Sequence, residues 1–409
     1  MIRIFAASAL AFACLAVDGG HTGRMVDFLW TAPLIIGSAF LIAWGAEAAQ
    51  FMMSQGLALA ILAWLQTLPE FAVEANNAWH AAKGTADYND GMVTANFTGS
   101  IRLLMGFGMP MVWVISAVAR KKKEIELDPL HSVEVVSIVP PVIYFFFMVW
   151  RGRLDLLDSV ILLGLYAMYL VLLLRMPPEE EDESIEDLPF VAKAIMKRGK
   201  RGRVIGVLAV FLLGGAILYL CVHPFVGSLM ALGVTLAISP NFLIQWIAPF
   251  LSEFPEKVSA FNWARQDGKA KLGLMNFLSS NINQMTMLVA MIPILYCIAK
   301  GHASAGINFN HDQKQEVLLT AAQSLLCAIL LFNMKFEWWD ALGMFAVWFA
   351  QFTGPFWERR VGLPEHGMRT AGIYLFLGWA ALEILLAVIG VRKWHFPLRL
   401  GAPRKPRPS

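Results

Sequence analysis

Long apolar segments recur along almost the whole chain, and they limit its fold more than any other feature. A helix needs about 20 mostly apolar residues to cross the hydrocarbon core of a bilayer, and this chain of 409 residues contains many such segments. Hydrophobic residues make up 57% and charged residues 15%, whereas soluble domains have about 45–50% and about 25%. We therefore expect an all-α membrane protein with many spanning helices, and the composition excludes an ordinary soluble enzyme.

A hydropathy window of about 19 residues locates the spanning helices. They are predicted near 3–17, 27–50, 54–82, 92–118, 133–150, 154–175, 204–224, 226–262, 271–299, 315–333, 337–353 and 370–391. Pro69 falls inside 54–82, and Pro240 and Pro255 fall inside 226–262, so both long segments are predicted to be broken or kinked. Interrupted helices are where transporters bind ions.

A charged segment at 176–203 divides the chain almost in half, with acidic residues first and basic residues after them. We interpret it as a solvated linker on the cytoplasmic side of the membrane. With that orientation, 22 Lys and Arg residues of the loops and tails are cytoplasmic and nine lie on the opposite face, as the positive-inside rule requires. Both termini are then cytoplasmic, and the first apolar segment stays as a helix rather than acting as a cleaved signal peptide.

The two halves of the chain share a motif built around a Pro-Glu pair. In each half Pro-Glu is followed by Asn six residues after the Glu, and then by Asn-Phe-x-small-Ser. These elements are Pro69-Glu70, Asn76 and Asn96 to Ser100 in the first half, and Pro255-Glu256, Asn262 and Asn276 to Ser280 in the second. Because an odd number of crossings separates the equivalent helices, we expect an inverted repeat with a pseudo-two-fold axis in the membrane plane.

Glu70 and Glu256 require a physical reason to lie in apolar segments. A carboxylate near the bilayer centre costs at least about 2.5–3.5 kcal/mol, so it is expected to face a partner or a water-filled cavity. The proline before each Glu frees a backbone carbonyl one turn earlier. Such oxygens are ligands of hard cations, including Ca²⁺ and Na⁺, and the motif has no His or Cys that would favour zinc or copper. Glu74, one turn beyond Glu70, is expected to approach the helix end.

At these residues the chain resembles the calcium/cation antiporter superfamily, which includes the sodium/calcium exchangers and the cation/proton exchangers. The repeats of that family typically read G-T-S-x-P-E and G-N-x-x-G-S-N. The resemblance implies two inverted five-helix repeats with an extra helix at each end, and it implies no cofactor. It also implies exchange of Ca²⁺ for Na⁺ or H⁺ by alternating access at a midplane site formed by Glu70 and Glu256. Further ligands implied by it are Ser100, Ser280, Thr67, Ser252, Glu253, Asn96, Asn276 and Gln284.

The chain departs from the family pattern close to these motifs. Leu104 and Gln284 stand where the family usually has Asn or Asp, and Glu253 adds a third carboxylate. Arg102 and Lys257 place two cations within about one helical turn of the motifs, where they pair with Glu253 or Glu74 or fill the cation site. The alternative function is therefore a non-transporting sensor or scaffold whose ion site is filled by Arg102 or Lys257. Arg102 lying between Glu70 and Glu256 would favour that alternative.

Six parts of the chain follow from these patterns. They are an extra helix at 1–26, a first antiporter repeat at 27–175, the linker at 176–203, a second repeat at 204–353, an extra helix at 354–391 and a basic tail at 392–409. The expected partners are the lipid bilayer, most simply the inner membrane of a bacterium, and inorganic cations. A net charge of +3 gives no reason to expect nucleic-acid binding, and the chain has no Ser/His or paired-Asp arrangement that indicates an enzyme.

Overall fold

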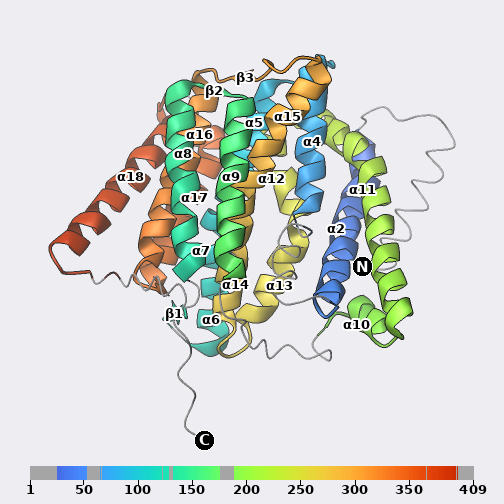
Figure 1. Ribbon diagram of the computed structural model, residues 1–409. Helices are drawn as coiled ribbons and strands as arrows, with labels where there is room; N and C mark the ends of the chain where they lie inside the picture. The colour runs from blue at the N-terminus through green and yellow to red at the C-terminus, as the bar shows by residue number, and fades with distance from the viewer. Residues whose placement is uncertain are drawn as a thin grey trace, which may run out of the picture.

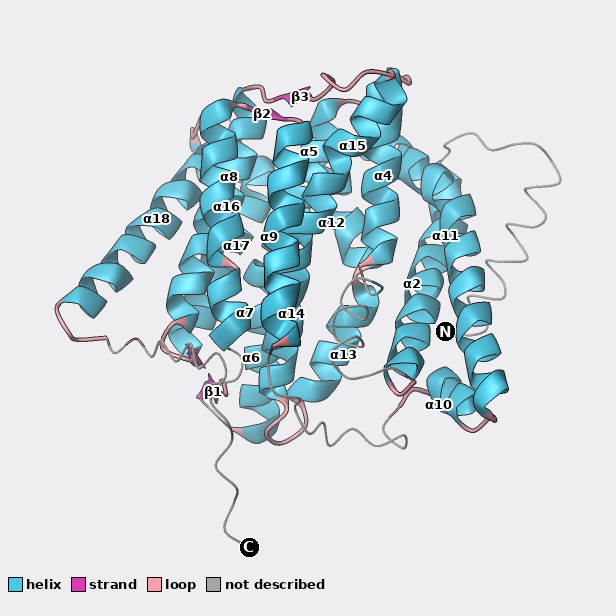
Figure 2. Ribbon diagram, in the orientation of Figure 1, coloured by secondary structure: helices cyan, strands magenta, loops and turns pink. Residues whose placement is uncertain are grey.

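The computed structural model describes residues 25–52, 65, 67–121, 123–128, 132–175, 188–364, 366–392 and 394. They form a bundle of long helices with a short two-stranded sheet at each end (Figures 1 and 2). Eight helical segments among these residues are long and apolar enough to cross a membrane. This confirms the predicted all-α membrane fold. The helix expected at 3–17 and residues 54–64 and 66 of the segment at 54–82 lie outside the described residues.

The first half of the chain contains the helices up to the linker. Its elements are η1 (Met25–Asp27), α2 (Phe28–Gln50), α4 (Leu68–Lys83), α5 (Asp90–Leu103), η2 (Leu104–Gly108), α6 (Met109–Arg120), β1 (Glu124–Glu126), α7 (Ser132–Ser137), α8 (Val139–Arg151), β2 (Arg153–Leu154) and α9 (Leu156–Leu174). A short helix, α10 (Phe190–Met196), follows at the end of the linker.

The second half contains the equivalent helices and one more. Its elements are α11 (Lys200–Leu236), α12 (Pro240–Ser252), α13 (Phe254–Ala264), α14 (Ala270–Asn283), η4 (Gln284–Leu288), α15 (Val289–Lys300), β3 (Ile307–Asn308), α16 (His311–Leu331), β4 (Lys335–Glu337), α17 (Trp338–Trp357), η5 (Glu358–Val361) and α18 (Gly367–Val388). α18 is the extra helix that the sequence predicts after the second repeat.

The two halves repeat the same elements in opposite orientations. α5 and α14 each run into a π-helical turn, η2 or η4, and continue as α6 or α15. β1, which follows α6, pairs antiparallel with β4, and β3, which follows α15, pairs antiparallel with β2. The pair β2–β3 lies at the upper end of the bundle and β1 at the lower end (Figure 1). This reciprocal pairing is what a two-fold axis in the membrane plane produces, so the inverted repeat is confirmed.

Prolines start the interrupted helices where the sequence predicts. α4 has Pro69 in its first turn, α12 begins at Pro240, and α13 has Pro255 in its first turn. Proline is tolerated there because the amide that it lacks has no helical partner in a first turn. From these starts α4 runs to the upper end of the bundle and α13 towards the lower end (Figure 1). Both helices therefore begin inside the bundle.

The helix boundary predicted near residue 225 is wrong. The segment predicted at 204–224 and the start of the one predicted at 226–262 form a single helix, α11, which continues through Pro224 to Leu236. It ends where Ala237 takes a left-handed conformation with φ of 54°. An internal proline removes one helical hydrogen bond but does not force an end. α11 lies beside α2 along one side of the bundle (Figure 1).

The small residue before Ser100 in the first repeat has a packing reason. α5 crosses α12 so closely that a Cβ atom added to Gly99 would lie 1.9 Å from the backbone oxygen of Gln245. A backbone atom at that distance cannot move aside without shifting a whole helix. Gly99 therefore sets the distance between α5, which carries Ser100, and α12, which leads to Glu253.

Replacing Gly99 with Ala is expected to destabilise the protein by about 1–3 kcal/mol, because overpacked cores lose about that much. The measurement is thermal unfolding of the purified protein in detergent. Gly164→Ala is the matched control, since Gly164 is exposed on α9 and a Cβ there meets no atom within 4 Å. Equal unfolding temperatures for the two variants would contradict the close approach of α5 and α12.

Candidate ion-binding site

The two repeat glutamates lie at the interrupted helices in the interior of the bundle. Glu70 stands in the first turn of α4 and Glu256 in the first turn of α13, and they are 1% and 5% exposed. The N-terminus of a helix carries partial positive charge, which stabilises a carboxylate in the first turn. The same break therefore buries each carboxylate and compensates part of its charge.

Glu70 is joined to a third carboxylate, Glu253, which lies in the break between α12 and α13. The Nε2 atom of Gln284 donates to Glu70 Oε2 at 2.9 Å and to Glu253 Oε1 at 2.8 Å. Ser100 of α5 also donates a hydrogen bond to Glu253 Oε1. Because one amide nitrogen reaches both carboxylates, Glu70 of the first repeat lies beside Glu253 of the second.

Glu256 is bound by the equivalent serine of its own repeat. The hydroxyl of Ser280 donates to Glu256 Oε2 at 2.9 Å. Glu256, Ser252 and Asn276 line the same small cavity of about 10 Å³, which has room for about one water molecule. Three of the predicted ligands, Ser252, Ser280 and Asn276, are thus gathered around Glu256.

Lys257 supplies a fixed positive charge next to these carboxylates. Its Nζ atom donates to Glu253 Oε2 at 2.7 Å, and the two side chains are 5% and 3% exposed. The pair of Lys257 and Glu253 is neutral when both groups are ionised. Glu70 and Glu256 then leave the site with a formal charge of −2.

Two other predicted ligands take different positions. Thr67 is buried directly before α4, next to the turn that holds Glu70. Asn96 has Glu74 as its hydrogen-bond partner, because its Nδ2 atom donates to Glu74 Oε2 at 2.6 Å. The expectation that Glu74 approaches a helix end is wrong, because α4 continues to Lys83 and Glu74 is 0% exposed. Its spacing of four residues from Glu70 indicates the same helix face and could have identified it from the sequence.

The sequence pattern of the family described as sodium/calcium exchanger protein matches residues 25–175 and 206–357, once in each repeat. This chain belongs to the sodium/calcium exchanger family. No curated protein matched the chain. Among solved structures, the H⁺/Ca²⁺ exchanger CAX superimposes on this family member with a TM-score of 0.85 and 27% identity, covering 95% of this chain and 94% of CAX.

Two further solved structures share the fold of this family member. YfkE gives a TM-score of 0.60 at 15% identity and covers 86% of this chain and 98% of its own. The sodium-calcium exchanger NCX_Mj gives 0.50 at 17% identity and covers 79% of this chain and 95% of its own. The inverted-repeat architecture is therefore the one that sodium/calcium exchanger relatives adopt.

Arg102 of this exchanger-family protein does not lie between Glu70 and Glu256. Its guanidinium binds Glu316 of α16, donates to Gln351 Oε1 of α17 at 2.7 Å, and lies 5.1 Å from the ring centroid of Trp246. These contacts satisfy the cation within a separate cluster. Arg102 therefore gives no support to the alternative in which it fills the ion site, and only Lys257 remains in contact with the site carboxylates.

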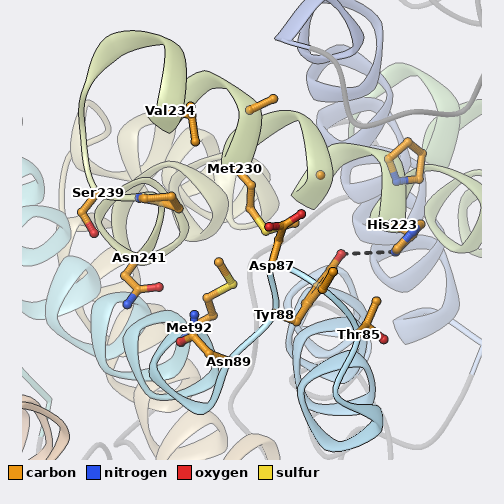
Figure 3. Close-up of a pocket in the computed structure, with 15 residues that line it drawn as sticks. Thr85, Asp87, Tyr88, Asn89, Met92, His223, Met230, Val234, Ser239 and Asn241 are labelled. Carbon is orange, nitrogen blue, oxygen red and sulfur yellow. Dashed lines mark hydrogen bonds between the residues drawn. The ribbon is translucent and has the colours of Figure 1, made fainter.

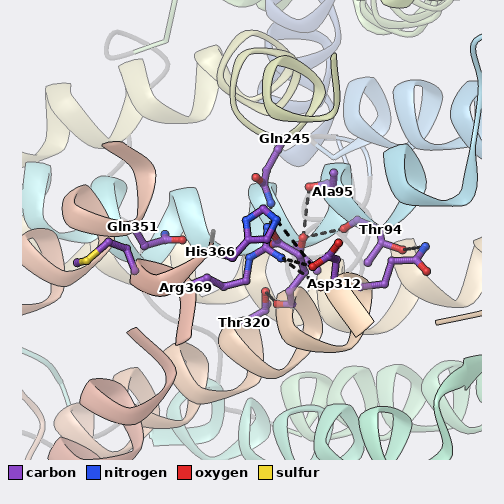
Figure 4. A network of polar contacts seen from close by, with 12 residues as sticks. Thr94, Ala95, Gln245, Asp312, Thr320, Gln351, His366 and Arg369 are labelled. Atoms are coloured by element: carbon purple, nitrogen blue, oxygen red, sulfur yellow. Dashed lines mark hydrogen bonds and ion pairs between the residues drawn. The ribbon is translucent and has the colours of Figure 1, made fainter. Parts of the chain in front are cut away.

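The cluster around Arg102 reaches the extra helix α18. Arg369 of α18 pairs with Glu316 at 2.6 Å, and Gln245 of α12 donates to Glu316 at 2.8 Å (Figure 4). One buried carboxylate therefore connects α5, α12, α16 and α18. In this member of the family, an ion pair as well as apolar packing holds α18 against the repeats.

A cavity of about 610 Å³ lies where α4 ends and α5 begins, against α11 and the start of α12 (Figure 3). In its wall the hydroxyl of Tyr88 bonds to Nδ1 of His223 at 3.2 Å and accepts from Asn76 of α4 at 3.2 Å. Burial raises the pKa of the Tyr88 phenol to about 12, so it remains a hydroxyl at neutral pH. The cavity wall is thereby joined to the helix that carries Glu70.

Replacing Lys257 with Met is expected to destabilise the protein strongly, because it leaves Glu253 as a buried charge without its cation. Breaking one side of a buried pair costs about 3–5 kcal/mol. The double variant Lys257→Met with Glu253→Gln should recover most of the loss, because both charges are absent. The measurement is thermal unfolding in detergent of the wild type, both single variants and the double variant. Additive effects of the two single changes would contradict a buried ion pair.

Proposed function

We propose that this protein is an antiporter that exchanges Ca²⁺ for protons by alternating access at a site formed by Glu70 and Glu256. The observation that carries the proposal is the burial of two glutamates that have no cation of the protein paired with them among the described residues, and their formal charge is −2 when both are ionised. One glutamate from each inverted repeat lies at the start of an interrupted helix, and Lys257 neutralises the third carboxylate, Glu253. A divalent cation matches the remaining charge of −2.

Buried oxygen atoms that have no hydrogen-bond donor support the proposal that a cation binds near Glu70 and Gln284. Glu70 Oε1 and Gln284 Oε1 are buried and accept no hydrogen bond among the described residues. We propose that they bind Ca²⁺ together with Glu256, Ser280 and oxygens of the turns at Thr67 and Ser252, since hard cations take carboxylate, amide, hydroxyl and carbonyl oxygens. Ser100, Asn276 and Glu253 then orient this set, and Asn96 is not part of it.

Two arguments favour protons as the counter-ion: the cost of a buried charge and the similarity to a proton-coupled exchanger. When Ca²⁺ leaves, two carboxylates remain in a low-dielectric interior, where an uncompensated charge is unfavourable. Protonation neutralises both without further ligands, so the emptied site can reorient. The likeness to the H⁺/Ca²⁺ exchanger CAX, at 27% identity over 95% of the chain, agrees with this choice. Na⁺ is the other counter-ion that the repeat motif allows.

We further propose that the segment 176–203 and both termini are cytoplasmic, that the repeats span 27–175 and 204–353, and that the membrane is a bacterial inner membrane. α10, beside the basic start of α11, lies at the lower end of the bundle (Figure 1). Basic residues of this part include Lys197, Lys200 and Arg201. Such a concentration of cations favours the cytoplasmic face.

A second candidate function rests on the contact between Lys257 and Glu253. A lysine held at 2.7 Å from a site carboxylate can serve as a permanent substitute for a transported cation. The protein would then keep the exchanger fold as a sensor or scaffold without transport. Ion flux measured on the purified protein separates the two functions.

Proteoliposomes with an acidic interior and radioactive Ca²⁺ outside are expected to accumulate Ca²⁺. Glu70→Gln and Glu256→Gln should each reduce the uptake to that of protein-free liposomes, because either change removes one of the two charges that match Ca²⁺. Glu383→Gln is the control, since Glu383 is a buried glutamate of α18 outside the site, and it should keep the uptake. Uptake retained in Glu256→Gln would contradict the proposed site.

The counter-ion is tested with the same liposomes. A protonophore that collapses the pH gradient should stop the uptake, whereas a Na⁺ gradient without a pH difference should not drive it. Uptake driven by Na⁺ alone would replace protons with Na⁺ in the proposal. Absence of flux for every cation under both gradients would favour the non-transporting alternative.

A further inference from the structure

Glu74 is a buried carboxylate for which the proposed exchange has no use. It lies one turn beyond Glu70 on α4 and is 0% exposed. Its Oε2 atom accepts a hydrogen bond from Asn96 Nδ2 at 2.6 Å, and its Oε1 atom has no partner. Among the ion pairs of the described residues none includes Glu74. A negative charge is thus enclosed in the bundle with one neutral donor beside it.

Two asparagines next to Glu74 present further oxygens without partners. Asn77 is 0% exposed, and neither atom of its amide forms a hydrogen bond. The spacing of three residues places it beside Glu74 on α4. Asn96 of α5 is 1% exposed, and its Oδ1 atom has no partner. Buried polar atoms of native proteins are nearly always satisfied by protein groups, ordered water or ions, so these three oxygens are available to a bound group.

The arrangement is specific to the first repeat. The position four residues after Glu256, which is equivalent to Glu74, is Ala260. Asn276, which is equivalent to Asn96, is half-buried and lines the small cavity beside Glu256. Repeat symmetry therefore does not account for Glu74 and its neighbours, and the charge is an addition in one half of the molecule.

We propose that Glu74, Asn77 and Asn96 bind a monovalent cation with the hardness of Na⁺, at a site separate from Glu70 and Glu256. One carboxylate and two neutral amides compensate a single positive charge, whereas a divalent ion would leave the site with a net charge of about +1. Carboxylate and amide oxygens suit hard cations. A proton on Glu74 could be shared with only one neighbouring oxygen, whereas a cation contacts all three.

The cavity of about 610 Å³ lies beyond the end of α4, on the side of Glu74 away from Glu70. Tyr296 of α15 donates a hydrogen bond to Asp90. Asp90 is half-buried at the start of α5, directly after Asn89, which lines the cavity of about 610 Å³. Asn76 of α4 donates a hydrogen bond to Tyr88, which lines the same cavity. The proposed site therefore lies between this cavity and Glu70.

The test is Na⁺-dependent thermal unfolding of the purified full-length protein in detergent, at fixed pH and ionic strength with a Ca²⁺ chelator present. N-methylglucamine replaces Na⁺ as the balancing cation. The wild type is expected to gain stability with Na⁺ in a saturable manner, as for any ligand that binds only the folded state. Glu74→Gln should show no Na⁺ response, and Glu70→Gln, the matched change one turn away, should keep it.

Three outcomes overturn the proposal. They are a wild type that does not respond to Na⁺, a Glu74→Gln variant that responds as the wild type does, and a Glu70→Gln variant that loses the response. If Glu74→Gln does not fold, Asn77→Leu takes its place, and a folded variant without the Na⁺ response supports the site. The readout does not depend on transport, so failure of Ca²⁺ exchange leaves this result distinguishable.

Discussion

A carboxylate enclosed in a membrane-spanning bundle has to be compensated by its surroundings, and this requirement explains the arrangement of the helices around Glu70 and Glu256. Each glutamate follows a proline that starts a helix inside the bundle. The helix start supplies backbone dipoles, and the facing helix supplies a serine or an amide donor. Without these breaks, the two carboxylates would lose the backbone dipoles of a helix start.

The same requirement explains the asymmetry between the repeats. The second repeat has an additional carboxylate, Glu253, and it carries Lys257 one turn later to neutralise it. The first repeat has an additional carboxylate, Glu74, which has no cation as a partner in the described part of the chain. Arg102 compensates a different carboxylate, Glu316. Each of these added charges therefore has a partner that can be named or that is the subject of a proposal.

Local features of the fold could be predicted from the sequence because local chemistry determines them. Pro69 and Pro255 mark the starts of α4 and α13, and the repeated motif indicates the inverted architecture. Pro224 gave a wrong boundary, because a single proline weakens a helix without deciding where it ends. The π-helical turns have no local signal that distinguishes them from a regular helix.

Contacts across the molecule could not be predicted in the same way. Arg102 and Glu316 are 214 residues apart in the chain, and only the packing of α5 against α16 brings them together. Gln284 was a candidate ligand from its place in the motif, but its bridge between Glu70 and Glu253 depends on both repeats. The roles of the candidate ligands in ion binding remain predictions, because the fold fixes their positions and only binding measurements can assign their functions.

The two short sheets have a consequence for the origin of the molecule. β1 and β2 belong to the first repeat, yet each pairs with a strand of the second, at opposite ends of the bundle. A single repeat on its own would expose one unpaired edge at each membrane surface. A second copy of the repeat in the opposite membrane orientation supplies a partner strand for both edges. The strand pairing thus has the geometry expected of a dimer of two identical, oppositely inserted chains.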